Sequence, residues 1–186
     1  LLPTDRVRHV GEAVAIVVAQ SRAASLLGQE MVDVRYDELA FVTDSAAAAQ
    51  PDAPTVWDEV PGNVFVETRF GDAQATDAAF ARAAHVARAQ FHIGRVTAVP
   101  MEPRSALAHY DAGTGRYTLY AGSGGAVKQK RELAEMMGID GQRLRVLSHD
   151  VGGNFGARNR VYVEFGLVLW AARRTGRPVK YTATRS

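Results

Sequence analysis

A glycine-rich segment in the C-terminal third carries the residues best suited to binding chemistry. It consists of Gly152, Gly153, Asn154, Phe155 and Gly156. Three glycines with one aromatic residue among them allow the backbone to approach a ligand closely. Backbone N–H groups near the start of a helix favour an anion such as a pyrophosphate. The segment therefore predicts a site for a phosphate-bearing cofactor, and the spacing leaves open an ordinary tight turn between a strand and a helix.

This segment differs from both common nucleotide-binding motifs. A P-loop requires Lys followed by Ser or Thr after its second glycine, whereas Ala157 and Arg158 follow here. The G-x-G-x-x-G spacing of dinucleotide-binding folds is also missing from the segment. We therefore expect no nucleotide hydrolysis.

A second turn contains Ser123, Gly124 and Gly125 in an Ala-x-Ser-x-Gly arrangement, which is close to the nucleophile elbow of serine hydrolases. That fold needs an acid and then a histidine after the serine, but His149 is the last histidine and precedes Asp150. A serine hydrolase is therefore only a minor alternative. The five histidines include no pair at helical metal-ligand spacing, so we predict no direct protein–metal site.

Regular elements must position these two turns. A strand-like run at 143–147 precedes the glycine segment, and an apolar helix-like run at 161–175 follows it. The second turn lies between a predicted strand at 116–120 and a predicted helix at 126–137, which Gly138 is expected to end. Further predicted elements are a strand at 106–110 that forms a hairpin through 111–115, strands at 14–19, 32–36, 64–70 and 85–93, helices at 22–31 and 76–84, and a capped turn at 45–50.

Composition limits the class of protein. A chain of 186 residues with 47% apolar content can bury a real core, and its mixed helices and strands predict an α+β fold. The 22 Lys and Arg residues are scattered among 20 Asp and Glu residues, so no nucleic-acid interface is expected. Without cysteine, this chain supplies no disulfide, thiolate nucleophile or iron–sulfur ligand.

The chain is also expected to be cytoplasmic and to have no membrane span. Its longest uncharged apolar runs, such as 13–19, fall well below the roughly 20 residues that a bilayer requires. The first residues lack the charged start and apolar middle of a signal peptide. Proline, glycine and asparagine punctuate residues 51–63, which we predict to be a linker between two domains.

Several motifs, taken in order, resemble the molybdenum-binding subunit of the xanthine dehydrogenase and aldehyde oxidase family. In the C-terminal third they are residues 150–156, Glu164 within an apolar run, 176–181, and Thr184 with Arg185. Residues 7–15 resemble the segment that enters the hammerhead domain of that family. Residues 100–104, Pro-Met-Glu-Pro-Arg, resemble a motif of the branch that contains the carbon monoxide dehydrogenase large subunit.

The resemblance implies a fold and a set of partners. Residues 1–50 would be the end of a hammerhead domain, and 64–186 the first part of a molybdopterin-binding domain. Because the family's subunits are several times longer, we expect a fragment, and the rest of the molybdenum subunit becomes its first partner. The implied cofactor is molybdenum–molybdopterin cytosine dinucleotide, and 2Fe-2S and FAD are expected on partner subunits or on other segments. The implied partners are an iron–sulfur small subunit and an FAD medium subunit, in a complex expected to be a homo-oligomer.

The same resemblance implies roles for particular residues. Residues 152–156 would hold the pterin, with Phe155 and Gly156 closest to the metal. Ser123 and Gly125 lie in a turn that, in the family, usually carries a glutamine that hydrogen-bonds an oxo ligand of the metal. A gapless alignment places Gly124 at the position of that glutamine. Asn159 stands where purine-hydroxylating relatives carry a substrate-contacting glutamate, which argues against xanthine as substrate; a helix N-cap is the alternative role for this asparagine.

The implied activity is the oxidation of an aldehyde, an N-heterocycle or a similar small substrate, with water as the oxygen source. The family's general-base glutamate lies near the far C-terminus, and no residue here matches it. We therefore expect no catalytic residue in this stretch and no activity from it alone. A noncatalytic interaction module derived from the family is the alternative function.

Charged residues near these motifs are predicted to be structural. Glu102 and Arg104 flank Pro103, and Glu164 lies among apolar residues of the 161–175 helix. A carboxylate in an apolar setting must be paired or face a polar cavity. We expect ion pairs that lock loops.

Overall fold

The computed structural model describes residues 1–94 and 96–184, so Arg185 of the Thr-Arg motif lies outside the described residues. The chain divides into two compact units. One contains the described residues of Leu1–Asp33 and Val96–Ser186, and the other those of Val34–Arg95. The predicted linker, 51–63, lies within the second unit. The assignment of residues 1–50 to a hammerhead domain stays a prediction.

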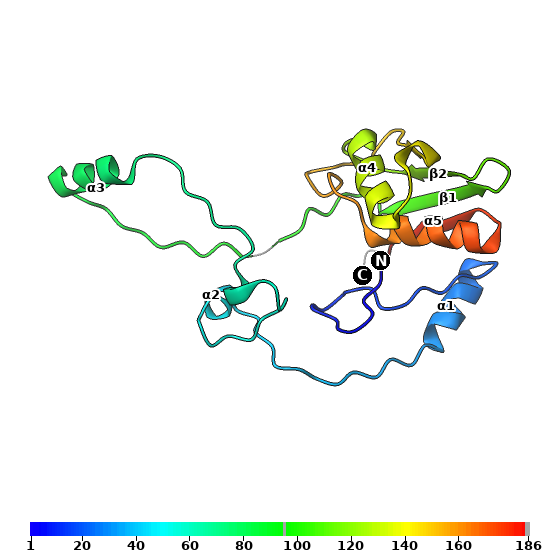
Figure 1. Cartoon of the computed structure of the whole chain (residues 1–186), viewed down its shortest axis with the longest axis horizontal. Coiled ribbons are helices and arrows are strands. Elements are labelled where there is room, and N and C mark those ends of the chain that lie inside the picture. The colour runs from blue at the N-terminus through cyan, green and yellow to red at the C-terminus, as the bar shows by residue number, and fades with distance from the viewer. Residues whose placement is uncertain (95, 185–186) are drawn as a thin grey trace. The chain divides into compact units, whose positions relative to one another are not determined.

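A four-stranded sheet in the order β3-β2-β1-β4 organises the first unit (Figure 1). Its strands are β1 (Ser105–Asp111), β2 (Arg116–Ala121), β3 (Leu144–Leu147) and β4 (Val179–Thr182). β1 pairs antiparallel with β2 and with β4, whereas β2 pairs parallel with β3. Alternate residues of β1 and β2 are buried, as expected for strands that turn one face to a core.

Two helices cover the sheet and complete the core. α4 (Ala126–Met137) packs against β3, and α5 (Val163–Thr175) packs against β1 and β4. Each ends at a left-handed glycine, Gly138 and Gly176. The buried side chains come from both helices and the sheet, and the largest are Tyr117, Leu119, Leu133, Leu144, Val168 and Leu169.

The remaining elements are short. They are α1 (Arg22–Glu30), α2 (Ser45–Ala48), α3 (Ala73–Arg82) and two 3₁₀ turns, η1 (Pro61–Asn63) and η2 (Gly141–Arg143). Ser21 caps α1 by accepting a hydrogen bond from the Ala24 N–H at 3.2 Å, and Asp44 caps α2 through the Ala47 N–H at 2.7 Å. These helices confirm the predicted helices at 22–31 and 76–84 and the capped turn at 45–50.

The predicted strands at 14–19, 32–36, 64–70 and 85–93 are wrong, because none of these segments forms a strand in the part of the chain that the structure describes. A strand needs a neighbour to satisfy its N–H and C=O groups, and the sheet of the described residues pairs with none of these segments. In the three later segments the large apolar side chains are exposed, for example 86% for Phe65 and 83% for Phe91, whereas Val14, Ile16 and Val17 are half-buried. An apolar, β-branched run in the sequence therefore indicates side chains suited to packing, but it does not show whether a partner strand is present.

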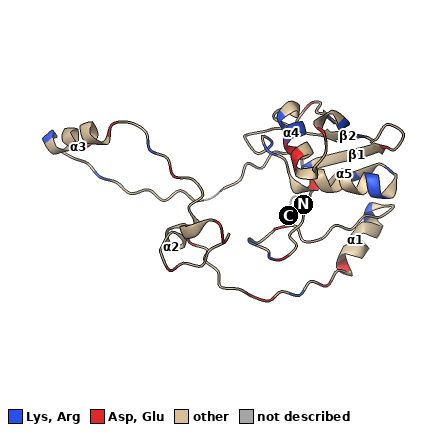
Figure 2. Cartoon of the chain, in the orientation of Figure 1, with Lys and Arg blue, Asp and Glu red and all other residues tan. Residues whose placement is uncertain are grey.

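The distribution of charged residues and the length of the apolar helices show whether the described residues form a charged surface or a membrane span. Basic and acidic residues are interspersed along the ribbon of both units (Figure 2). Within the described residues, no helix has the length and apolar character needed to cross a bilayer.

The turn between β1 and β2 is closed by the Asp111 carboxylate. It accepts hydrogen bonds from the Thr114 hydroxyl at 2.7 Å and from the Gly113 N–H at 2.9 Å. The hydroxyl bond, followed by the backbone bonds, lowers the pKa of Asp111 below its ordinary value. Ionisation of Asp111 therefore stabilises the folded turn. This contribution to folding stability is present at a pH above the unfolded pKa of Asp111 and is lost as the pH falls through its lower folded pKa.

We expect Thr114→Val to raise the pKa of Asp111 toward its ordinary value, because the strongest hydrogen bond to the carboxylate is removed. An NMR titration of the Asp111 side chain measures the shift. The same change at Thr175, whose hydroxyl donates to the Ala171 carbonyl instead, serves as the control. An unchanged Asp111 pKa in the Thr114 variant would show that the hydroxyl does not hold the carboxylate.

Candidate functional site

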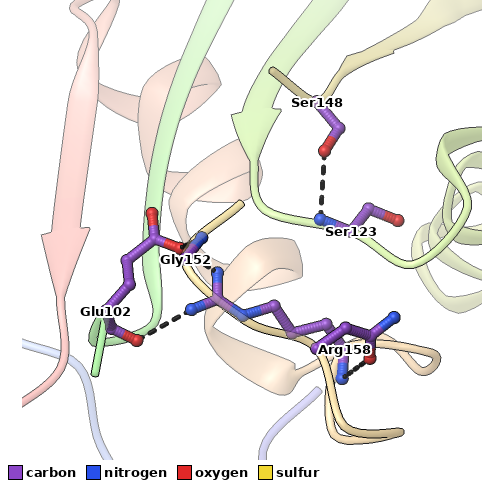
Figure 3. Close-up of polar contacts among 6 residues, drawn as sticks. Glu102, Ser123, Ser148, Gly152 and Arg158 are labelled. Atoms are coloured by element: carbon purple, nitrogen blue, oxygen red, sulfur yellow. Dashed lines mark hydrogen bonds and ion pairs between the residues drawn. The ribbon is translucent and has the colours of Figure 1, made fainter. Parts of the chain in front are cut away.

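Two loops, one after each of the parallel strands β2 and β3, lie side by side (Figure 3). We call residues 122–125 the serine loop and residues 151–157 the glycine loop. The Ser123 N–H donates to the Ser148 Oγ at 3.1 Å, and the Gly124 N–H donates to the Arg158 carbonyl at 2.9 Å. Since carboxyl ends of parallel strands meet at one sheet edge, ligands commonly bind there. The structure thus brings together the two segments that the sequence singled out.

Most N–H groups of the glycine loop already donate within the protein. The Gly152 N–H donates to the Glu102 Oε2 at 2.7 Å, and the Gly153 N–H donates to the Val151 carbonyl at 2.9 Å. The Gly156 N–H donates to the Asn154 Oδ1 at 3.1 Å. Among the residues that the structure describes, the Val151, Asn154 and Phe155 N–H groups of this loop have no acceptor. Of these, the Asn154 and Phe155 N–H groups are adjacent to each other and lie within the glycine-rich segment 152–156.

The glycines of the two loops serve different purposes. A Cβ at Gly152 would lie 2.5 Å from the Glu102 Cβ, and one at Gly122 would lie 2.2 Å from the Arg158 Nη1. These two glycines therefore make room for side chains of the protein. Gly156, with φ +84°, has no atom within 4 Å of the Cβ position. Gly125 is likewise open, so no side chain of the protein fills the space at these two positions.

Phe155 combines backbone strain with exposure. Its φ is +48°, in the left-handed region that bulky residues rarely adopt, and its side chain is 79% exposed. Holding such a residue there costs on the order of 1–3 kcal/mol, and such strain clusters at binding sites. The Phe155 ring therefore does not fill the core.

Asn154 and Asn159 occupy the space beside Gly124. The Asn154 Nδ2 donates to the Asn159 Oδ1 at 3.0 Å. A Cβ at Gly124 would lie 2.1 Å from that oxygen and 2.4 Å from that nitrogen. No side chain fits at position 124 while this amide pair is in place. The pair is therefore the polar group that stands where the gapless alignment expects a glutamine.

Two expectations about the start of α5 are wrong. The helix begins at Val163 with Tyr162 as its N-cap residue, so Asn159 is not its N-cap. The glycine loop is also separated from the helix N-terminus, because the Asn154 side chain draws the following residues into a turn. Its Oδ1 accepts from the Arg158 N–H at 3.1 Å, and its carbonyl accepts from the Ala157 N–H at 2.9 Å.

Ion pairs confirm the structural roles predicted for Glu102 and Glu164. Glu102 Oε2 lies 2.9 Å from the Arg158 Nη1, and Glu164 Oε1 lies 2.8 Å from the Arg104 Nη2. The Arg104 guanidinium also lies 4.1 Å from the centre of the Tyr162 ring. Burial lowers the pKa of Arg104, but the hydrogen bond and charge of Glu164 outweigh it and raise that pKa above the ordinary value.

The geometry does not assemble a serine hydrolase site in the described part of the chain. The Ser123 Oγ accepts from the Gly125 N–H at 2.9 Å, and no described histidine bonds to it. His149 instead stacks on Tyr120, with ring centres 6.4 Å apart. Within the described residues, no three His, Cys, Asp or Glu side chains are grouped to hold a metal ion.

Arg158 is the site residue that sequence reasoning missed. Position 158 entered the sequence comparison only as a departure from the P-loop pattern. Its side chain is 4% exposed, which is rare for arginine unless it is paired. The pair could have been suggested only by a basic residue directly after the glycine loop and an acidic residue in the upstream segment Pro-Met-Glu-Pro-Arg.

The available groups fit an anionic cofactor. The N–H groups of Asn154 and Phe155 offer two adjacent donors, and Gly156 leaves open space beside them. Preorganised N–H donors bind anionic atoms without further rearrangement. The exposed Phe155 ring supplies an apolar cover.

Comparison with known proteins identifies the family. Residues 56–186 match the molybdopterin cofactor-binding domain. Over its whole length the chain is 38% identical to the nicotine 6-hydroxylase large subunit of Paenarthrobacter nicotinovorans, and the match covers 22% of that subunit. It is 30% identical over its whole length to 24% of the carbon monoxide dehydrogenase large chain of Hydrogenophaga pseudoflava.

A solved structure agrees over nearly the whole chain. Quinoline 2-oxidoreductase from Pseudomonas putida 86 superposes with a TM-score of 0.89 at 37% identity, and the match covers 99% of this chain and 23% of that one. This chain thus spans about a quarter of the length of the relatives it matches. The predicted α+β fold and the predicted resemblance are confirmed. The chain belongs to the molybdopterin cofactor-binding domain family.

Proposed function

We propose that this chain forms the cofactor-binding part of a longer molybdenum hydroxylase large subunit, and that residues 152–156 hold the molybdopterin. The observation that carries this proposal is the glycine loop itself. It presents two free N–H donors, the open space at Gly156 and the strained, exposed Phe155. Residues 123–125 would line the other side of the same space.

The residues of this chain would bind and orient the cofactor. The Asn154 and Phe155 N–H groups would donate to its acceptor atoms, and the Phe155 ring would exclude water from one side. When bound, a molybdenum–molybdopterin cofactor supplies a two-electron oxidation with water as the oxygen source. The proposed form is the cytosine dinucleotide.

We propose an N-heterocycle as the substrate. Nicotine and quinoline are N-heterocycles, and the relatives named for them are 38% and 37% identical to this chain, compared with 30% for a carbon monoxide dehydrogenase large chain. Asn159 would lie at the substrate side of the glycine loop. The proposed partners are a 2Fe-2S small subunit and an FAD medium subunit, in a cytoplasmic, homo-oligomeric complex.

Analysis of metal and nucleotide tests the proposal. The full-length protein that contains this chain is co-expressed with its neighbouring subunits and purified. We expect close to one molybdenum and one cytosine nucleotide per large subunit, and hydroxylation of a quinoline or pyridine substrate. A folded protein without molybdenum or nucleotide would instead favour a noncatalytic module. The 186-residue chain alone is expected to show no hydroxylase activity.

A further inference from the structure

We propose that Arg158 is a positioning residue that holds the serine loop and the glycine loop in register, with Glu102 as its counter-charge. The expected consequence, retention of the cofactor, rests on the proposed function. The geometric basis of the positioning role is independent of that function, because it consists of contacts within the chain (Figure 3).

Arg158 binds the segment upstream of β1 through two side-chain nitrogens. Its Nη1 lies 2.9 Å from the Glu102 Oε2, and its Nη2 donates to the Glu102 carbonyl at 2.7 Å. The arginine is 4% exposed and its partner carboxylate is 38% exposed. A buried cation must be paired, and removal of one partner leaves an uncompensated charge. The pair therefore fixes the position of the Arg158 side chain.

The same two residues reach both loops. Glu102 Oε2 also accepts the Gly152 N–H at 2.7 Å, which ties it to the glycine loop. The Arg158 carbonyl accepts the Gly124 N–H at 2.9 Å, and its Nη1 occupies the space beside Gly122. Through their ion pair and the Arg158 backbone carbonyl, Glu102 and Arg158 thus connect three segments of the chain.

Loss of the guanidinium would release both loops together. Glu102 would lose the charge that orients its carboxylate toward Gly152, and a cavity would open beside Gly122. A lysine would restore the charge but could not bond both the carboxylate and the carbonyl of Glu102 with a fixed planar group. The donors at Asn154 and Phe155 would then no longer be held in one arrangement.

The test compares two arginines in the full-length protein. Arg158→Met removes the ion pair with Glu102, whereas Arg104→Met removes the other ion pair of the same segment, whose partner Glu164 lies on α5. We expect Arg158→Met to lower molybdenum and nucleotide content per folded protein tenfold or more. Arg104→Met should keep at least half of the wild-type content, and Arg158→Lys should fall between them.

Hydrogen exchange of the Gly124 and Gly152 amides gives a second readout. Both should exchange at least tenfold faster in Arg158→Met than in Arg104→Met. Should Arg158→Met fail to fold, Glu102→Gln serves in its place, because it keeps an oxygen for the Gly152 N–H and removes only the charge.

Each outcome decides the question. If the two Met variants show the same cofactor content and the same exchange rates, Arg158 has no positioning role. This holds whether both variants keep the cofactor or both lose it. If the wild-type protein contains neither molybdenum nor nucleotide, the proposed function fails, and the exchange rates alone still decide whether Arg158 holds the loops.

Discussion

Gly153→Val is expected to abolish molybdenum occupancy of the full-length protein. Gly153 has φ +103°, a conformation that a β-branched residue cannot adopt without strain. A Cβ there would lie 2.9 Å from the Phe155 Cε2 and 3.2 Å from the Pro100 Cβ. The added methyl groups would therefore displace Phe155 or the backbone that presents the free N–H donors. Metal analysis of the purified, folded variant measures the effect.

Gly176→Val is the matched control for Gly153→Val. Gly176 ends α5 with φ +65° and has nothing within 4 Å of its Cβ position, so valine there introduces backbone strain without a clash in either loop. We expect lower thermal stability and normal molybdenum per folded protein. Wild-type molybdenum content in the Gly153 variant would refute a cofactor site at this loop.

Gly124→Gln is the second substitution with a large expected effect. A side chain at 124 overlaps the Asn154–Asn159 amide pair, at 2.1 Å from one amide and 2.4 Å from the other. Displacing Asn154 breaks its bond to Asn159 and the two that its Oδ1 accepts from the Gly156 and Arg158 N–H groups. At about 1 kcal/mol each, the loss of the two bonds from the Gly156 and Arg158 N–H groups alone changes the population of the native loop by roughly thirtyfold.

The metal's spectroscopic signal, cofactor content and rates with N-heterocycles report this change. Asn159→Gly combined with Gly124→Gln should recover part of the loss, because the oxygen nearest to the new side chain is gone. Gly141→Ala is the control, since its Cβ would make only ordinary contacts at 3.9 Å. If Gly124→Gln left all three measurements unchanged, position 124 would not face the cofactor.

The sequence predicted best those elements whose signals are local. The helix at 126–137 has the predicted bounds, and Gly138 ends it as expected. The β1–β2 hairpin follows from a turn-rich connection between two strands. In each case the relevant contacts lie within a few residues, so propensity and turn chemistry were sufficient.

Long-range relations could not be predicted. Paired and unpaired apolar runs look alike in sequence, which is why β3 was predicted correctly and 64–70 was not. The site shows the same limit, because Asn154 and Gly124 are neighbours only after folding. The glycine loop was found from its composition, whereas the bond that occupies the Gly152 N–H and the role of Arg158 depend on Glu102, 50 or more residues away.

The place of β1 in the sheet has a consequence for synthesis of the chain. β1 is flanked by β2 and β4, but its pairing residues on β4 emerge roughly 70 residues after those on β1. At 5–20 residues per second, a ribosome leaves that edge of β1 open for about 4–14 s. An open edge can pair with other nascent chains. Slow translation between residues 111 and 179 should therefore increase aggregation, and a chaperone that covers this edge should reduce it.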